Sequence, residues 1–173
     1  MSTPTLTGQV IGQAHYATRA LLERAVAPLG VSFGQVLALN VLAAGAVERD
    51  RLVQRITGTL KVDEPAVQQI IAELLDADLA RNASPDGGAS VGDDSAAIGD
   101  ASVGGDSSAV GPAIRLTDTG RAVQARIAGA VGDITGRLYG DIPADEAATV
   151  ARVLTLVTQR ANAELATLPA SSI

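Results

Sequence analysis

The chain has 173 residues, of which 47% are hydrophobic and only 2% aromatic, so a core must be built from closely packed Leu, Val, Ile and Ala. It contains no Cys, which excludes disulfides, thiolate chemistry and Cys-based metal sites. No signal-peptide pattern and no run of about 18 apolar residues occurs, so we expect a soluble cytoplasmic protein. The formal net charge of −6 has the wrong sign for a protein that binds phosphates.

The first predicted helix covers about residues 6–27, where apolar side chains recur at helical spacing. Leu6, Val10 and Leu21 lie on one face, and Leu22 and Val26 lie near another. A helix that is apolar over so broad an arc needs more than one neighbour.

Two helices are predicted next. The first begins at Ser32, because Ser32 and Gln35 have the spacing of a capping box, and it ends near Gly45. The second is short, from about Glu48 to Thr57, and we expect Gly58 to break it. It buries apolar residues and shows arginines to water.

A further helix is predicted from Asp63 to Asp76. Asp63 can cap it, and Pro65 is tolerated in its first turn. Its apolar residues recur at helical spacing: Val67, Ile70, Ile71, Leu74 and Leu75. Since it follows another short helix and a turn, it has the position of a recognition helix in a helix-turn-helix.

Two short strand candidates, Leu79–Arg81 and Ala113–Leu116, can pair as a hairpin around an insertion covering residues 82–113. Within the insertion, the sequence from Ser90 to Gly99 is nearly repeated from Ser102 to Gly111. The segment holds five Asp and no Lys or Arg, and without it the formal net charge would be −1 instead of −6. We expect a mobile loop tip. The Asp spacing fits neither an EF-hand loop nor the nonapeptide calcium-binding repeat, so no metal site is predicted.

Apolar periodicity returns after the hairpin. Thr117 can cap a helix whose apolar residues are spaced by four, four, three and four positions: Val123, Ile127, Val131, Ile134 and Leu138. A last helix follows Pro143, with Asp145 and Glu146 suited to its N-terminal dipole. These broad apolar faces predict an intertwined two-fold dimer. The alternative is a monomer in which the terminal helices complete an ordinary core.

In this order the parts resemble the MarR family of winged helix-turn-helix regulators over almost the whole chain. The segment from Arg115 to Gly120 is similar to the family's second wing strand with its Leu-Thr-x-x-Gly signature. Weaker similarities cover Ser32–Leu42 and Val62–Arg81. The resemblance implies a fold that is mainly α with a small β-hairpin wing. It implies dimerisation helices at residues 1–30 and 118–173 and a DNA-binding lobe at residues 31–117.

The resemblance also implies a DNA-contacting surface. Ala66, Gln68 and Gln69 occupy the exposed N-terminal half of the predicted recognition helix, which has no Lys or Arg. Gln can pair with adenine through two hydrogen bonds. Phosphate contacts would then come from basic residues around the turn and at the base of the wing: Arg49, Arg51, Arg55, Lys61, Arg81 and Arg115.

The family further implies a small, often aromatic or phenolic, effector. His15, Tyr16 and Arg19 lie within one helical turn, and Phe33 opens the next helix, so these four are the candidate effector residues. They are alternatively surface or interface residues. No catalytic triad, paired carboxylates or metal ligands are present, so neither an enzyme nor a cofactor is predicted.

The predicted function is therefore a homodimeric regulator of transcription, such as a repressor, that binds double-stranded DNA at a pseudo-palindromic operator. The alternative keeps the fold but has weak or lost DNA binding, and acts as a protein-interaction or ligand-sequestering module. The negative charge and the absence of Lys and Arg from the recognition helix motivate this alternative.

Overall fold

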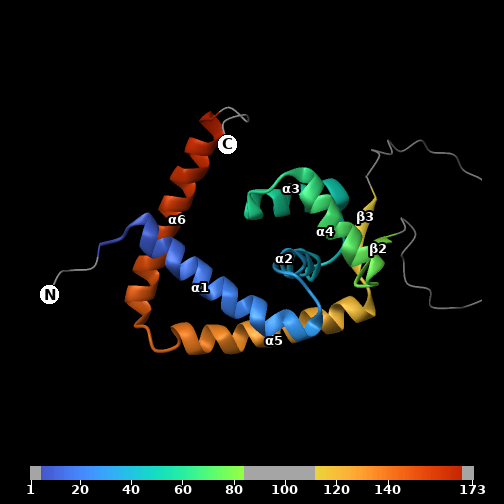
Figure 1. The fold of residues 1–173 in the computed structure, drawn as a ribbon, viewed down its shortest axis with the longest axis horizontal. Coiled ribbons are helices and arrows are strands. Elements are labelled where there is room, and N and C mark those ends of the chain that lie inside the picture. The colour runs from blue at the N-terminus through green and yellow to red at the C-terminus, as the bar shows by residue number, and fades with distance from the viewer. Residues whose placement is uncertain (1–4, 84–111, 169–173) are drawn as a thin grey trace, which may run out of the picture. The chain divides into compact units, whose positions relative to one another are not determined.

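A computed structural model describes residues 5–83 and 112–168 (Figure 1). The repeats of the predicted insertion lie outside the described residues. The chain divides into two compact units, and the boundary falls within one helix, between Val131 and Gly132. The order of elements is α1 (Gly8–Val26), a short 3-10 helix (Ala27–Leu29), α2 (Phe33–Leu42), β1 (Val47–Glu48), α3 (Arg49–Leu60), α4 (Glu64–Asp76), β2 (Ala80–Ala83), β3 (Ala113–Leu116), α5 (Asp118–Tyr139) and α6 (Ala144–Thr167).

The predicted caps of α2 and α4 are confirmed. The Ser32 hydroxyl accepts a hydrogen bond from the Gln35 backbone N–H at 3.3 Å, and the Gln35 side-chain oxygen accepts one from the Ser32 N–H at 2.8 Å. Asp63 caps α4 by accepting from the Ala66 N–H at 3.4 Å, with Pro65 in the first turn. These contacts satisfy backbone donors that the start of a helix leaves unpaired.

The predicted end of α3 at Gly58 is wrong. The helix continues through Gly58 to Leu60, and Lys61 ends it in the left-handed region at φ 56°. Glycine inside a helix costs only about 1 kcal/mol relative to alanine. The buried face of α3, which includes Ile56, extends to Leu60, and Leu60 packs against the core. Burial therefore outweighs the propensity of one glycine.

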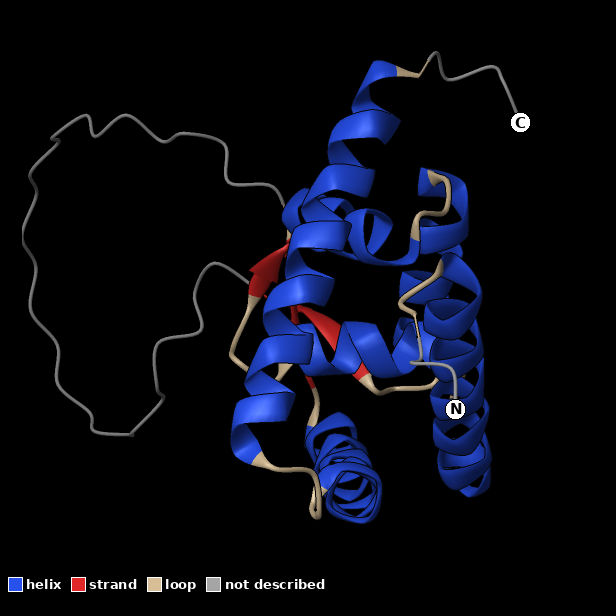
Figure 2. Ribbon diagram, turned by 90° about the vertical axis from the view of Figure 1, so that its left-hand side faces the viewer, coloured by secondary structure: helices blue, strands red, loops and turns tan. Residues whose placement is uncertain are grey.

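The predicted hairpin is confirmed, but the sheet contains a third strand. β2 pairs antiparallel with β3, with Ala80 opposite Leu116 and Ala83 opposite Ala113. Residues 82, 83 and 113, which we assigned to the insertion, thus belong to the sheet. β1 pairs with the other side of β3, giving the order β1-β3-β2. Figure 2 draws the strands in red. A strand of two residues is too short to show periodicity, so the sequence did not predict it.

One hydrophobic core lies among α2, α3, α4 and the sheet in the first unit. Its most buried large side chains come from all of these elements: Leu39, Leu42, Leu52, Ile56, Ile71, Leu74 and Ile114. Because these residues occupy the inner faces, α4 leaves its first turn and the opposite face exposed. The core therefore sets which side chains of α4 can meet a partner.

The start of α5 is tied closely to the turn that follows α4. The Thr117 hydroxyl donates to the Asp78 carbonyl at 2.6 Å and accepts from the Gly120 N–H at 2.9 Å. A Cβ atom at Gly120 would lie 1.8 Å from the Leu79 carbonyl oxygen. The Thr-x-x-Gly pattern is thus explained by a cap and a close backbone contact, and the predicted capping role of Thr117 is confirmed.

The second unit consists of the end of α5 and α6. Pro143 precedes the first residue of α6, and Asp145 and Glu146 lie in its first turn, as expected. No residue of α6 is buried, although the helix carries many apolar side chains. Among the described residues, no single helix is long and apolar enough to cross a membrane, whereas one bent pair, Gly8–Leu29 with Phe33–Leu42, meets that criterion together.

Candidate nucleic-acid interface

The exposed part of α4 carries the three residues predicted to contact bases. Ala66 and Gln69 are exposed, and Gln68 is partly buried. The guanidinium of Arg49 donates two hydrogen bonds to the Gln68 side-chain oxygen, from Nε at 3.1 Å and from Nη2 at 3.0 Å. The backbone N–H of Arg49 donates in turn to the Pro112 carbonyl at 3.1 Å. The first residue of α3 therefore links α4 to the chain just before β3.

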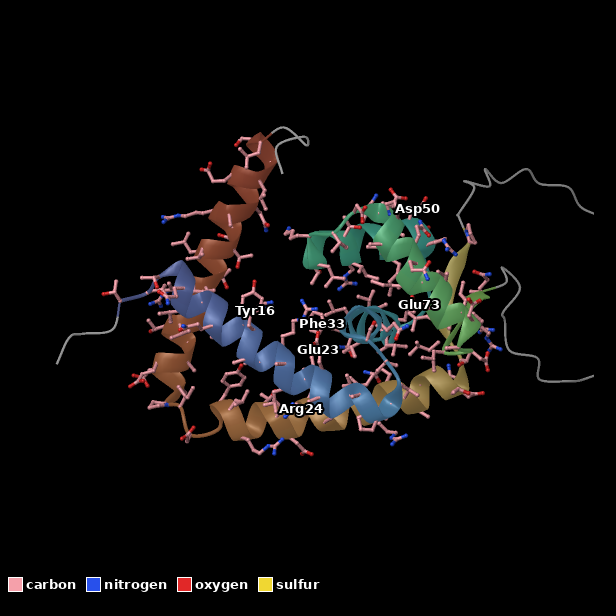
Figure 3. The ribbon with its side chains drawn as sticks, viewed as in Figure 1. Tyr16, Glu23, Arg24, Phe33, Asp50 and Glu73 are labelled. Atoms are coloured by element: carbon pink, nitrogen blue, oxygen red, sulfur yellow. The ribbon has the colours of Figure 1, made fainter. Side chains whose placement is uncertain are left out.

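Gln69 has a different partner. Its side-chain Nε2 donates to Oε1 of Glu73 at 3.1 Å, one helical turn further along α4. The other oxygen of Glu73 accepts from Nε2 of Gln35 on α2 at 2.9 Å. Figure 3 shows Glu73 on the side of α4 that faces α2. Gln35 and Glu73 are thus part of the candidate site.

Gln35 and Glu73 were not predicted from the sequence to belong to the site. The four-residue spacing of Gln69 and Glu73 is a signal that could have found their contact. The contact between Gln35 and Glu73 joins residues 38 positions apart, and no local pattern predicts it.

Of the six predicted phosphate contacts, Arg49 is bonded to Gln68, and the other five fall into two groups. Arg51 and Arg55 are exposed on α3, and Lys61 is exposed at its end. Arg81 and Arg115 lie directly opposite each other on β2 and β3. Like charges in opposite positions of an antiparallel pair repel each other.

Arg115 also lines a cavity of about 270 Å³ with Arg121 and the loop of residues 42–46. Among the described residues, the Nε atom of Arg115 is buried and has no hydrogen-bond partner. Arg121 donates to the Leu116 carbonyl at 3.2 Å and pairs with Asp118. Part of the Arg115 guanidinium is therefore withdrawn from the surface, unlike the exposed Arg81.

The structure brings the candidate effector residues together in two pairs. The Arg19 guanidinium lies 4.8 Å from the centroid of the Phe33 ring, and its Nε donates to Glu23 at 2.8 Å. The His15 and Tyr16 rings lie edge to face at 5.5 Å, and Tyr16 is 70% exposed. Figure 3 labels Tyr16 on α1 and Phe33 at the start of α2.

None of these four residues lines the cavity between α2 and α3. This cavity has a volume of about 220 Å³, and its walls combine apolar and polar side chains: Leu37, Asn40, Val41, Arg55, Ile56 and Thr59. The Asn40 side-chain oxygen accepts a hydrogen bond from Gln124 of α5 at 3.4 Å. An arginine and an amide on an apolar wall can hold a small anion with an apolar body.

No protein-family model and no curated protein matches this sequence. The fold is similar to solved structures. MarR from Escherichia coli in its apo form is 20% identical, with a TM-score of 0.59 over 90% of this chain and 98% of that one. A MarR mutant complexed with operator DNA is also 20% identical, with a TM-score of 0.61 over 87% of this chain and 91% of that one.

A MarR family protein of Mycobacterium tuberculosis in complex with salicylic acid is 16% identical, with a TM-score of 0.60 over 91% of this chain and 99% of that one. These similarities show that the chain has the winged-helix fold of the MarR family, which confirms the predicted fold class.

Proposed function

We propose that this chain, which has the winged-helix fold of MarR-family regulators, is a DNA-binding regulator of transcription that acts as a homodimer on a pseudo-palindromic operator. We also propose that it works in the cytoplasm. A small effector would modulate its binding by changing the spacing of the two recognition helices, which must reach half-sites about one helical turn apart.

The observation that carries this proposal is the arrangement of α3 and α4. The two helices pack on a common core, and α4 leaves its capped first turn and Gln69 exposed. Exposed cations lie on the neighbouring helix, at Arg51 and Arg55. An exposed amide that can bond a base edge thus lies on a helix that packs against one carrying cations that can bond phosphates, which is the combination that DNA recognition requires.

Exposed apolar side chains on the terminal helices support the homodimer. In the first unit, Val10 on α1 is 48% exposed. In the second unit, Val150, Leu154, Val157 and Leu165 of α6 are all exposed. Apolar surface of this extent marks an interaction site in a protein that is not embedded in lipid. A second copy of the chain would cover these faces symmetrically.

The cavity between α2 and α3 supports a small effector. Its walls are mostly apolar, and Arg55 supplies a cation, so we propose an aromatic or phenolic acid as the ligand. Arg55 is also a proposed phosphate contact. An effector that engages Arg55 would therefore compete with the DNA backbone for the same side chain. The Arg19 and Phe33 pair offers a second place where an aromatic ligand could stack.

Mobility-shift titration against the DNA upstream of the protein's own gene, at two salt concentrations, tests the proposal. We expect a specific shift that weakens steeply with salt. The double variant Arg51→Gln, Arg55→Gln should bind more weakly and with a smaller salt dependence. The matched control Arg152→Gln, Arg160→Gln removes two exposed cations of α6, a helix that the proposal does not assign to DNA, and should bind as the parent does. Absence of any shift by a folded dimer at low salt would refute DNA binding.

The net charge of −6 favours a second candidate function, a protein-interaction or ligand-sequestering module with weak or lost DNA binding. Deletion of residues 84–111 distinguishes the two. The deletion removes five aspartates and no cation, so a DNA-binding protein should bind DNA more tightly after it. For a module without DNA affinity, the deletion should leave DNA binding undetectable.

A further inference from the structure

We propose that Glu73 is a positioning residue that makes the two adjacent glutamines of α4 unequal: Gln69 reads adenine in the major groove, and Gln68 does not. The inference rests on the proposed function and names the residues that would give it sequence specificity. It also changes the expectation from sequence, which treated both glutamines as equivalent readers of adenine.

The orientation of each amide follows from the chemistry of its partner. A carboxylate can only accept hydrogen bonds, and a guanidinium can only donate them. The atom of Gln69 that meets Glu73 must therefore be its nitrogen, and the atom of Gln68 that meets Arg49 must be its oxygen. The two side chains consequently present opposite ends of the amide to their protein partners.

Gln68 has no free acceptor for a base. Both N–H groups that Arg49 directs at it converge on the single side-chain oxygen, at 3.1 and 3.0 Å. Pairing with adenine requires one acceptor for N6–H and one donor for N7. Gln68 retains only its donors, which fit acceptor edges such as N7 and O6 of guanine. It is also partly buried, which limits its reach.

Gln69 keeps the complete pair of groups. Glu73 occupies one N–H of its nitrogen, which leaves the other N–H and the side-chain oxygen available. The side chain is exposed on the same stretch of α4 as Ala66, whose small size leaves room for a base edge. Gln69 therefore has the groups and the exposure that adenine recognition needs.

Glu73 is itself held from a second helix. Gln35 is buried, its side-chain oxygen is committed to the Ser32 N–H, and its nitrogen is thereby directed at Glu73 at 2.9 Å. The cap of α2 thus fixes Gln35, Gln35 fixes Glu73, and Glu73 orients Gln69. An amide that is already oriented loses less conformational entropy when it binds.

Selection of binding sites from a random DNA library by the full-length protein tests this assignment. The parent should select adenine at one position of each half-site, with discrimination of roughly 10-fold or more against other bases. Gln69→Ala should abolish that preference. Gln68→Ala should leave it in place and weaken binding more uniformly.

One further variant tests the role of Glu73, and another tests Gln69 again. Glu73→Gln has the same shape but only one acceptor oxygen for two amide donors, so the adenine preference should fall several-fold while the melting temperature stays near that of the parent. Gln69→Glu should also abolish the adenine preference, because it removes the donor for N7 and places a carboxylate one turn from Glu73, which repels it.

The outcomes distinguish a failure of the proposed function from a failure of the roles assigned to Gln69 and Glu73. If the parent selects no sequence, the proposed function fails and the assignment fails with it. If the parent selects a site but Glu73→Gln keeps the full adenine preference, or if Gln68→Ala is the variant that removes it, the proposed function stands and the assignment of Gln69 and Glu73 is overturned.

Discussion

At the scale of single residues, backbone geometry determines which residue types are favourable at two positions, 120 and 61. Gly120 lies so close to the Leu79 carbonyl that a side chain has no room. Lys61 ends α3 with a φ of 56°, a conformation that favours glycine. A lysine there costs about 1 kcal/mol relative to glycine.

Gly120→Ala should lower the free energy of unfolding by at least about 1–3 kcal/mol, because the added Cβ meets the backbone rather than a side chain that can move away. Gly129→Ala, on α5 with open space around it, is the matched control and should raise stability by about 0.5–1 kcal/mol. Urea denaturation of both variants provides the comparison. Equal effects of the two substitutions would refute the steric explanation.

Lys61→Gly should stabilise the fold by about 0.5–1 kcal/mol, since it relieves the left-handed conformation. If Lys61 contacts a phosphate, the same variant should bind DNA more weakly, with a salt slope smaller by about 1. Thermal denaturation and salt-dependent titration measure the two effects separately. A variant that is more stable and binds DNA unchanged would remove Lys61 from the proposed interface.

At the scale of elements, the β2–β3 hairpin, the wing of the fold, carries two like charges at opposite positions. Arg81 and Arg115 face each other across β2 and β3, whereas Ile114 and Leu116 bury the other side of β3 in the core. The apolar side stabilises the hairpin, and the repulsion on the polar side opposes it. An anion bound over the two arginines would remove the repulsion.

Arg81→Glu should therefore stabilise the free protein by about 0.2–1 kcal/mol, because a repulsive pair becomes an attractive one. The same change should weaken DNA binding, since it replaces a proposed phosphate contact by a negative charge. Arg81→Gln is the intermediate control for both measurements. Tighter DNA binding by Arg81→Glu would contradict the placement of the wing base at the duplex.

At the scale of the whole molecule, the first unit contains the core, whereas α6 buries none of its residues within the structure described. A helix of 24 residues with exposed apolar side chains gains little stability alone in water. The homodimer would supply the burial that the single chain lacks.

The double variant Leu154→Asp, Val157→Asp should convert the dimer to monomer in light scattering after size-exclusion chromatography. Gln159→Glu, another exposed position of α6, is the control and should remain dimeric. Because a monomer holds only one recognition helix, DNA affinity of the double variant should fall by roughly 100-fold or more. A double variant that stays dimeric would exclude this face of α6 from the interface.

The sequence by itself determined the helix starts and the fold class. Capping residues such as Ser32 and Asp63 act on neighbouring backbone groups, and apolar periodicity records which face of a helix is buried, so both are readable locally. The cap formed by Thr117 was predicted for the same reason, whereas the need for glycine at position 120 comes from the distant Leu79 carbonyl.

Tertiary structure decided the rest. It placed β1 beside β3 and carried α3 through Gly58, because sheet pairing and burial at a distance outweigh local propensity. It also assigned different partners to Gln68 and Gln69, which have identical side chains and adjacent positions. Arg49 comes from α3, and Gln35, which holds Glu73, comes from α2. Only the packing of three helices brings these donors and acceptors within hydrogen-bond distance.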